Sequence, residues 1–257
     1  GDKEVIGLAL VTISAWMFCW FIVAQCIKRN DVADVAWGLG FVVLAWTLFI
    51  NRPSVQLSLA TLLVTFWGIR LSVHIFLRNR KKEEDYRYKQ WRQEWGRWFV
   101  ARSFLQIFAL QGVLLLLISA PLIALGKNGQ DSLTVINAIG VLLWFIGFVF
   151  ESVGDFQLVE FIKNPANKGK IMQTGLWKYT RHPNYFGEVT QWWGIWLVAF
   201  GSPWFVWTFI GPLTITVLIL KVSGIPLLEK KYAGNREFEN YKAHTRKFFP
   251  FPIKKKG

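Results

Sequence analysis

The sequence predicts an all-α integral membrane protein, a bundle of seven transmembrane helices with its N-terminus outside and its C-terminus in the cytoplasm. Three observations support this fold class. Hydrophobic residues make up 53% of the 257 residues and charged residues only 18%, the hydrophobic residues fall into long runs, and a formal net charge of +14 is gathered between alternate runs. A soluble nucleic-acid-binding protein or a disordered chain would be richer in charge and poorer in apolar residues. The composition therefore favours a chain that crosses a membrane several times.

Seven apolar runs match, to within a few residues, the length of about 20 residues that a helix needs to cross a bilayer. They are residues 4–27, 33–50, 54–77, 103–126, 132–154, 185–200 and 203–226. The first lacks a small-residue cleavage site, so we interpret it as a span rather than a signal peptide. The sixth is the shortest, and the seventh contains Gly211-Pro212, where a kink is expected because proline donates no backbone hydrogen bond.

The Lys and Arg residues lie almost entirely in alternate connections between these runs. Residues 28–31, 78–102, 155–184 and 227–257 hold 25 of the 30, whereas the N-terminus and the other connections hold 3. Because cytoplasmic loops carry the excess of Lys and Arg, these four segments are predicted to be cytoplasmic. Merging or adding one span would destroy the alternation, which supports a count of seven.

The cysteines and the basic loops exclude other classes of protein. Cys19 and Cys26 share one apolar run and no Cys/His cluster exists, so neither a disulfide framework nor a metal site is expected. Residues 78–102 interleave basic and aromatic side chains, which either stack on nucleic acid or lie at lipid headgroups. Its membrane neighbours favour the headgroups, so we expect membrane lipids as partners and no nucleic acid.

Ionisable residues near the predicted membrane are the first candidates for a site, because burying them in lipid is costly. Asp31 and Asp34 stand at the start of the second run, and Trp37 continues the same helical stripe. Capping of the helix suits Asp31. Asp34 lies a turn deeper and is a candidate functional residue.

The third run carries Trp67, Arg70 and His74 on one helical face. These side chains either line a cavity with Asp34 opposite, or Arg70 and His74 extend toward the cytoplasmic interface. For Arg70 we favour a structural ion pair, because a guanidinium stays charged and needs a partner when buried.

The fifth and sixth runs carry the densest polar cluster. Glu151 and Asp155 are spaced i, i+4 and are either functional or solvated at the interface. Asn184, Glu188 and Gln191 form a polar stripe along the sixth run. Pro183 suits the first helical position, and Lys178, Arg181 and His182 flank it, so the start of this helix is predicted to bind an anion.

The basic tail after residue 226 either anchors to lipid charge or folds back over the start of the sixth run. Cations beside carboxylates and aromatic residues suit a nucleotide with phosphates, such as NADPH. The sequence has neither the dinucleotide-binding fingerprint G-x-G-x-x-G after a strand nor a P-loop. Any nucleotide site here is therefore of another type.

Residues 175–188, which read GLWKYTRHPNYFGE, resemble the signature of the steroid 5-alpha-reductase superfamily in its bacterial branch. The resemblance extends to residues 34–40 (DVAWGLG), 84–88 (EDYRY), 226–229 and 241–250. It covers nearly the whole chain. The Arg-His-Pro-x-Tyr core is shared with membrane methyltransferases of the isoprenylcysteine carboxyl type, whereas the extended form is more specific to the reductases.

The resemblance implies that the first four helices, residues 4–126, enclose a lipid-like substrate and that residues 132–257 hold NADPH at the cytoplasmic side of a bacterial inner membrane. It implies reduction of a C=C bond conjugated to a carbonyl. For the oligomeric state, which the sequence leaves open, we slightly favour a monomer. The implied cofactor-binding residues are Asp155, Lys163, Asn167, Lys170, Tyr179, Arg181, His182, Asn184, Tyr185, Glu188, Trp192, Glu229, Tyr232 and Tyr241.

The sequence departs from the family in the acid pair that polarises the carbonyl. Asp34 stands where the steroid reductases have Glu. Every tyrosine lies at residue 86 or later and none within residues 103–126, so no tyrosine is available from the first four spans. We therefore predict Asp34 and His74 as the catalytic pair, because imidazole both donates hydrogen bonds and transfers protons near neutral pH. Trp37, Trp67 and Arg70 are predicted to line the substrate cavity.

Three functions compete. The first is an NADPH-dependent reductase of a lipid-like substrate such as a steroid, an isoprenoid or an enoyl lipid. The second is a membrane methyltransferase that uses S-adenosylmethionine on a lipid or prenyl thiol, and the third is a lipid-binding protein without enzymatic activity. Their responses to NADPH and to S-adenosylmethionine separate them.

Overall fold

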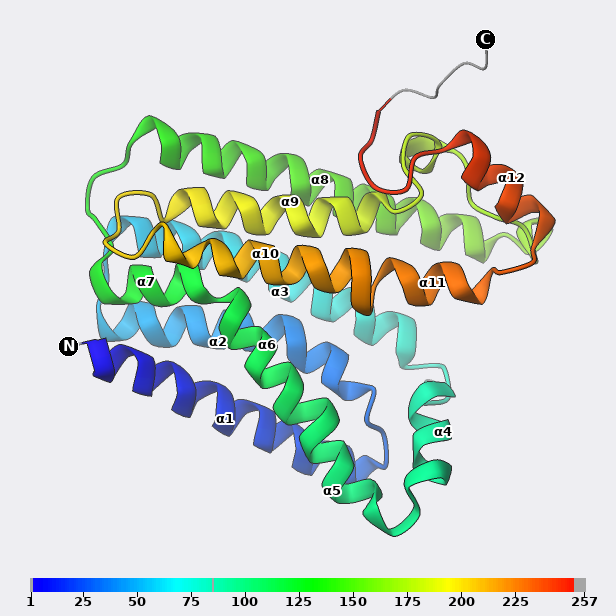
Figure 1. Cartoon of the computed structure of the whole chain (residues 1–257), viewed down its shortest axis with the longest axis horizontal. Helices are drawn as coiled ribbons and strands as arrows, with labels where there is room; N and C mark the ends of the chain where they lie inside the picture. The colour runs from blue at the N-terminus through cyan, green and yellow to red at the C-terminus, as the bar shows by residue number, and fades with distance from the viewer. Residues whose placement is uncertain (1, 85, 252–257) are drawn as a thin grey trace. The chain divides into compact units, whose positions relative to one another are not determined.

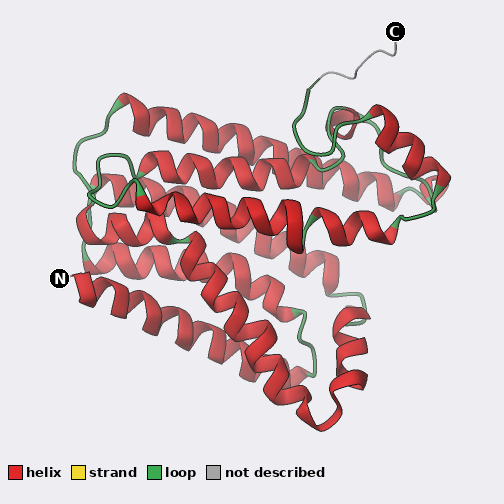
Figure 2. Cartoon of the chain, viewed as in Figure 1, coloured by secondary structure: helices red, strands yellow, loops and turns green. Residues whose placement is uncertain are grey.

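The computed structural model describes residues 2–84 and 86–251, and almost all regular structure within them is helical (Figures 1 and 2). The described residues include no named strand, only a parallel β-bridge between Thr180 and Arg246. The predicted all-α class is confirmed. Asp85 of the family-like segment and Lys254, Lys255 and Lys256 of the basic tail lie outside the described residues.

The chain forms two compact units. The first comprises Gly1–Asn137 and Val198–Gly211, and the second comprises Ala138–Leu197 and Pro212–Gly257. Each unit therefore contains one long stretch of the chain and one stretch contributed from further on.

The first unit begins with α1 (Asp2–Ile27), α2 (Val32–Asn51) and α3 (Val55–Asn79). Glycines allow α2 and α3 to pack closely, since a Cβ atom added at Gly38 would lie 2.9 Å from the carbonyl oxygen of Gly68. The Ser72 hydroxyl donates to the Val35 carbonyl oxygen over 2.9 Å and fixes the register of the pair. These three helices agree with the first three predicted spans.

The fourth predicted span, residues 103–126, is not one regular helix. The chain passes through α4 (Tyr86–Trp95), a 3₁₀ turn (Gly96–Trp98), α5 (Phe99–Ser103), a π-helical segment (Phe104–Ala109), α6 (Leu110–Ile118) and α7 (Ala120–Asn128). The change at Ser119 follows from Pro121, which has no N–H to donate and suits only the first turn of a helix.

The second unit contains most of α8 (Val135–Lys163), of α9 (Pro183–Val198) and of α10 (Ile210–Val217). It also contains a π-helical segment (Leu218–Val222), α11 (Ile225–Lys231) and α12 (Arg236–His244). Helix α8 continues to Lys163, beyond the predicted end of its span at residue 154. Apolar length marks where a helix meets lipid, whereas the backbone hydrogen bonds of the helix continue past it.

The expected kink at Gly211-Pro212 is not confirmed. Pro212 lies in the first turn of α10, where its missing N–H removes no interior hydrogen bond. The irregularity follows instead over the π-helical Leu218–Val222 and the bend at Ser223 and Gly224, which precede α11.

Six helical stretches of the described chain are long and apolar enough to cross a membrane. They are Lys3–Ile27, Val32–Asn51, Val55–Asn79, Tyr88–Ile118, Val135–Lys163 and Trp207–Lys231. Helix α9 has 16 residues and is shorter than all six. The multi-span prediction is confirmed at this level, and the count of seven spans and the orientation of the termini stay predictions.

Candidate functional site

Helices α8 and α9 run side by side and pack through glycines (Figure 1). A Cβ atom added at Gly147 of α8 would lie 2.5 Å from the carbonyl oxygen of Gly187 on α9. A Cβ atom added at Gly194 would lie 2.6 Å from the carbonyl oxygen of Gly140, two turns earlier on α8. With no side chains in between, the polar residues beside these glycines reach across the helix pair.

Asp155 and Asn184 form the first of these polar contacts. The Asn184 amide Nδ2 donates to Asp155 Oδ1 over 3.1 Å, and Asp155 is buried on α8. Gly154 permits this approach, since a Cβ atom added there would lie 3.2 Å from the backbone nitrogen of Asn184. The structure thus brings together two of the predicted cofactor-binding residues.

Glu151 and Gln191 form the second contact along the same helix pair. Gln191 Nε2 donates to Glu151 Oε2 over 2.6 Å, and the two residues are 2% and 1% exposed. Gln191 Oε1 is buried and accepts no hydrogen bond within the described part of the chain. Interfacial solvation, the alternative left open for Glu151, is therefore wrong.

Glu151 and Gln191 belong to the predicted polar cluster, by their spacing from Asp155 and from Glu188, but they are not among the predicted cofactor-binding residues. On the same helix as Gln191, Glu188 is half-buried and Trp192 is only 1% exposed.

Arg181, His182 and Glu229 form a compact charged cluster. Arg181 Nε and Nη2 lie 3.0 and 2.9 Å from Glu229 Oε1, and His182 Nε2 lies 3.0 Å from the same oxygen. Arg181 Nη1 also donates to the Thr245 carbonyl oxygen over 2.6 Å. Three predicted cofactor-binding residues therefore bond to one another or to the tail in this structure.

The basic tail folds back against the residues that precede α9. The Arg181 N–H donates to the Arg246 carbonyl oxygen over 2.9 Å, beside the β-bridge between Thr180 and Arg246. The Tyr241 hydroxyl donates to the Trp177 carbonyl oxygen. Of the two predicted alternatives for the tail, lipid anchoring and folding back over the start of α9, the structure shows the second.

Burial sets the protonation of two groups in this region. It lowers the pKa of His182, although the Glu229 carboxylate acts in the opposite direction. Burial also raises the pKa of Tyr241, which keeps its hydroxyl protonated as a donor to Trp177. The cluster is thus a neutral imidazole and a phenol around one Arg–Glu ion pair.

The predicted anion site at the start of α9 has several of its donors already engaged. The His182 N–H donates to the Thr180 hydroxyl over 3.3 Å, and the Tyr185 N–H donates to Asn184 Oδ1 over 3.0 Å. Pro183 has no N–H, and Arg181 is paired with Glu229. The N–H groups of His182 and Tyr185 and the guanidinium of Arg181 are therefore already bonded within the chain.

The remaining predicted cofactor-binding residues lie nearer the surface. Lys163 pairs with Glu160 over 2.6 Å, and Asn167 donates to the Phe161 carbonyl oxygen over 2.9 Å at the end of α8. Lys170, Tyr179 and Tyr232 are exposed, and Tyr185 is half-buried with its ring 5.8 Å from that of His182. Within the described residues, no three His, Cys, Asp or Glu side chains gather into a metal site.

The predicted catalytic and substrate residues belong to the first unit. Asp34 is half-buried in the first turn of α2, and His74 is half-buried near the end of α3, as is Arg70. Trp67 is buried, with its ring 5.4 Å from that of Phe41.

The Phe41 ring also lies 5.2 Å from that of Trp37, so the predicted cavity-lining tryptophans are parts of one aromatic cluster with Phe41 between them. Asp31 does not cap α2 as expected. Its backbone has the αR conformation, in which the side chain does not reach the N–H groups ahead, and it pairs with Arg29 over 2.7 Å instead.

Comparisons with known proteins give two curated relatives. A probable O-methyltransferase of Ustilaginoidea virens is 40% identical over 73 residues, which are 28% of this chain and 26% of that protein. An uncharacterized protein of Schizosaccharomyces pombe is 24% identical over 210 residues, 73% of this chain and 60% of that protein. The chain therefore spans less than two thirds of the length of either relative.

A family described as "Protein of unknown function (DUF1295)" matches residues 20–245, which include the contacts between α8 and α9 and the cluster around Glu229. This match covers far more than half of the sequence. The chain belongs to the DUF1295 family.

Proposed function

We propose that this protein is an NADPH-dependent membrane reductase that reduces a C=C bond conjugated to a carbonyl in a lipid-like substrate. One observation carries the proposal: a column of buried polar contacts, Asp155 with Asn184 and Glu151 with Gln191, lies on the helix that bears the reductase-like signature. Buried polar groups in an otherwise apolar helix pair are costly unless they serve a ligand or a specific packing.

The donors and acceptors of this column fit the sugar and amide parts of a nucleotide. The buried Gln191 Oε1 needs a donor, such as a hydroxyl or an amide N–H, and the Asp155 carboxylate accepts from hydroxyls. Asn184, Glu188 and Trp192 complete the proposed contacts. Lys163 and Lys170 are exposed cations suited to phosphate groups.

We propose a positioning role for the cluster of Arg181, His182 and Glu229. Their shared bonds hold the tail against the start of α9, and so fix the backbone that carries Asn184. The Tyr241 hydroxyl holds the chain ahead of α9 through its hydrogen bond to the carbonyl oxygen of Trp177.

Bound NADPH would supply the hydride for the β carbon of the substrate. His74, and Asp34 in its protonated form, are proposed to donate hydrogen bonds or a proton to the carbonyl oxygen, which draws electron density from the double bond. The complete reaction adds one hydride and one proton across the C=C bond and leaves the carbonyl intact. The aromatic cluster of Trp37 and Trp67 suits an apolar, ring-containing or isoprenoid substrate.

We further propose that seven helices cross a bacterial inner membrane, with α9 as the short sixth span. The strongly one-sided distribution of Lys and Arg supports an outside N-terminus and a cytoplasmic cofactor site. A monomer with membrane lipids around it is the proposed state.

Titration of the purified protein with NADPH tests the function. Binding should raise the melting temperature by mass action and quench tryptophan fluorescence. Asn184→Ala and Glu188→Gln should weaken this response, whereas Lys230→Gln, exposed on α11, should not. If the wild-type protein responds to neither NADPH nor NADH, the reductase proposal is wrong.

The match to a probable O-methyltransferase favours a second candidate, a lipid methyltransferase that uses S-adenosylmethionine. The shared Arg-His-Pro core of residues 181–183 is compatible with it. A thermal shift produced by S-adenosylmethionine, and absent with NADPH, would decide for this second candidate.

A further inference from the structure

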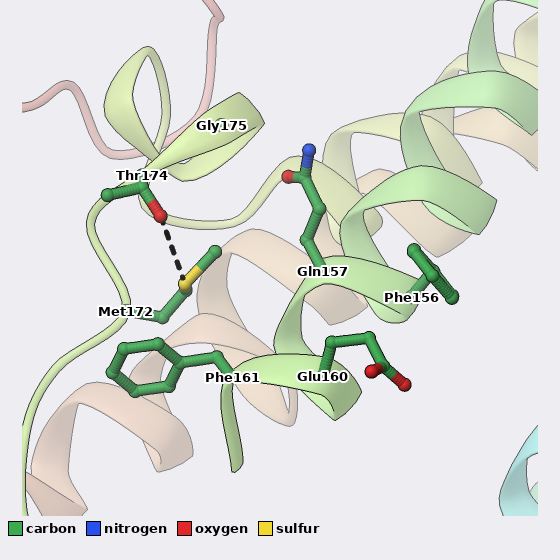
Figure 3. Close-up of a pocket in the computed structure, with 7 residues that line it drawn as sticks. All are labelled: Phe156, Gln157, Glu160, Phe161, Met172, Thr174 and Gly175. Atoms are coloured by element: carbon green, nitrogen blue, oxygen red, sulfur yellow. Dashed lines mark hydrogen bonds between the residues drawn. The ribbon is translucent and has the colours of Figure 1, made fainter. Parts of the chain in front are cut away.

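A cavity of about 300 Å³ lies at the end of α8, wholly within the second unit (Figure 3). One wall is the last two turns of α8, and the other is the loop that leads to the 3₁₀ turn Gly175–Lys178. The lining includes Phe156, Gln157, Glu160 and Phe161 from α8 and Met172 and Gly175 from the loop. None of these six residues belongs to the proposed contacts described above.

Hydrogen bonds hold both walls of this cavity in place. The Leu176 N–H donates to Gln157 Oε1 over 3.0 Å and ties the loop to α8. The Ile171 N–H and Gln173 Nε2 donate to Glu237 Oε1 over 3.1 and 3.0 Å and tie the start of the loop to α12. The cavity is open to solvent on one side, and anchored segments rather than a free loop form its two walls.

Gly175 suits this arrangement in two ways. Its φ is +61°, which side-chain-bearing residues rarely adopt. A Cβ atom added there would also lie 2.5 Å from both terminal atoms of the Gln157 amide. The positive φ is the stronger reason for glycine here, because the Gln157 amide is the end of a flexible side chain and could move aside for a Cβ atom.

The lining combines apolar and polar side chains: Phe161 and Met172 lie together, and Phe156 lies apart from them beyond Gln157 and Glu160 (Figure 3). Phe156, Phe161 and the thioether of Met172 offer aromatic and polarisable faces, and the Thr174 hydroxyl donates to the Met172 sulfur over 3.7 Å and orients it. The Gln157 amide and the Glu160 carboxylate supply a donor and acceptors. This composition suits a planar heteroaromatic ring that carries an exocyclic amino group.

We propose that this cavity binds the adenine base of a nucleotide. The inference rests on the proposed function, since it assigns one end of the same cofactor. At about 300 Å³ the cavity is at the small end of ligand pockets, so it would take the base and leave the rest of the nucleotide outside.

An anionic lipid headgroup is the alternative ligand for this cavity, and the charge of the lining argues against it. Among the described residues of the lining none is a cation that would hold a headgroup phosphate, and the exposed Glu160 carboxylate accepts a hydrogen bond from the adenine amino group. Lys163 pairs with Glu160 at the rim, where it can meet a phosphate attached to the base through its ribose.

Binding measurements with cofactor fragments test the proposal. The full-length protein is titrated with NADPH, with adenosine 2′,5′-bisphosphate, which keeps only the adenosine end, and with reduced nicotinamide mononucleotide, which lacks it. Phe161→Ala should weaken NADPH and the bisphosphate roughly fivefold or more, as expected for a lost base–aromatic stack, and leave the mononucleotide unchanged.

Two further variants keep the test independent of folding. Thr174→Phe, at an exposed position in the lining, fills the cavity and should block the bisphosphate while the unliganded melting temperature stays the same. Ile162→Ala removes an adjacent, exposed side chain outside the lining and is the matched control, with no expected change.

The outcomes separate this inference from the proposed function. Wild-type binding of NADPH with no effect of Phe161→Ala or Thr174→Phe, or with equal loss for all three probes, overturns the adenine site and leaves the reductase. If wild-type protein ignores NADPH but binds S-adenosylmethionine, and both variants weaken that binding, the adenine site stands and the reductase fails. No binding of any adenine-containing probe overturns both.

Discussion

The contact between Glu151 and Gln191 links two helices through a buried carboxylate and a buried amide. Gln191→Leu keeps the approximate volume but removes the Nε2 donor. Because hydrogen bonds to charged groups contribute about 1.5–3 kcal/mol, we expect a loss of that order in the free energy of unfolding. Chemical unfolding in detergent measures it.

The control for this substitution is Gln93→Leu, which changes the same residue type at an exposed position of α4. A change within about 0.5 kcal/mol is expected there. Equal stabilities of the Gln191 and Gln93 variants would mean that the α8–α9 contact carries no stability.

His182 makes stability depend on pH, because burial lowers its pKa in the folded protein. The unfolded chain binds a proton near the ordinary value of about 6.5, whereas the folded protein resists it. This contribution is complete above pH 6.5 and is lost as the pH falls from there toward the lowered value. Melting temperatures measured between pH 8 and 5.5 should therefore decrease at the acid end.

His182→Gln removes the titrating group but retains an amide donor for Glu229. The variant should lose part of the acid-side decrease, with Arg181 and Lys247 still beside the site. An unchanged pH profile would assign the decrease to other groups.

For these residues, the sequence predicts which of them belong to the site better than it predicts which residues they contact. Asp155 and Asn184 were expected at one site, and they bond to each other. Arg181 was expected near a phosphate, yet it pairs with Glu229, 48 residues further along. Spacing along a helix reveals a shared face, whereas a contact between distant segments depends on how the tail returns, which no local pattern specifies.

Helices α8 and α9 depend on the absence of side chains at their crossing. A Cβ atom added at Gly187 would collide with the backbone of Gly147 and Glu151, which cannot rotate away as a side chain does. We expect Gly187→Ala to lower the free energy of unfolding by about 1–3 kcal/mol, as overpacking does. It should also weaken nucleotide binding, because the polar contacts beside it are pulled apart.

Gly7→Ala on α1 is the matched control, since a Cβ atom added there meets nothing within 4 Å. Alanine is favoured over glycine in a helix by about 0.5–1 kcal/mol, so this variant should be neutral or slightly more stable. Similar losses at both positions would indicate a general intolerance of substitution rather than close helix packing.

Helix existence was predictable for most of the chain, and helix ends less so. Apolar runs located α1, α2 and α3 to within two residues, because a lipid-facing helix and its apolar run nearly coincide. They did not locate the end of α8 at Lys163 or the π-helical Phe104–Ala109. Hydropathy reports contact with lipid, and carries no information on where backbone hydrogen bonds shift or continue.

The whole molecule combines an apolar sequence with a net charge of +14, and the positive charge is distributed unevenly between the two ends of the helices. Exposed lysines at residues 163–178 lie at and after the end of α8, and further basic residues are in the tail. At the other end of α8, the last turn of α7 holds Lys127 and the connection from α7 to α8 holds Asp131. If cytoplasmic segments collect the Lys and Arg residues, these two ends of α8 face opposite sides of the membrane.

Cysteine labelling tests this orientation. In a variant with Cys19 and Cys26 replaced by Ala, single cysteines are introduced as Ser132→Cys and Lys168→Cys, both at exposed positions on opposite ends of α8. A membrane-impermeant maleimide should label the Ser132 variant in intact cells, and the Lys168 variant only after permeabilisation. The reverse pattern would place the polar contacts of α8 and α9 outside, away from cytoplasmic NADPH, and would contradict the proposed function together with the orientation.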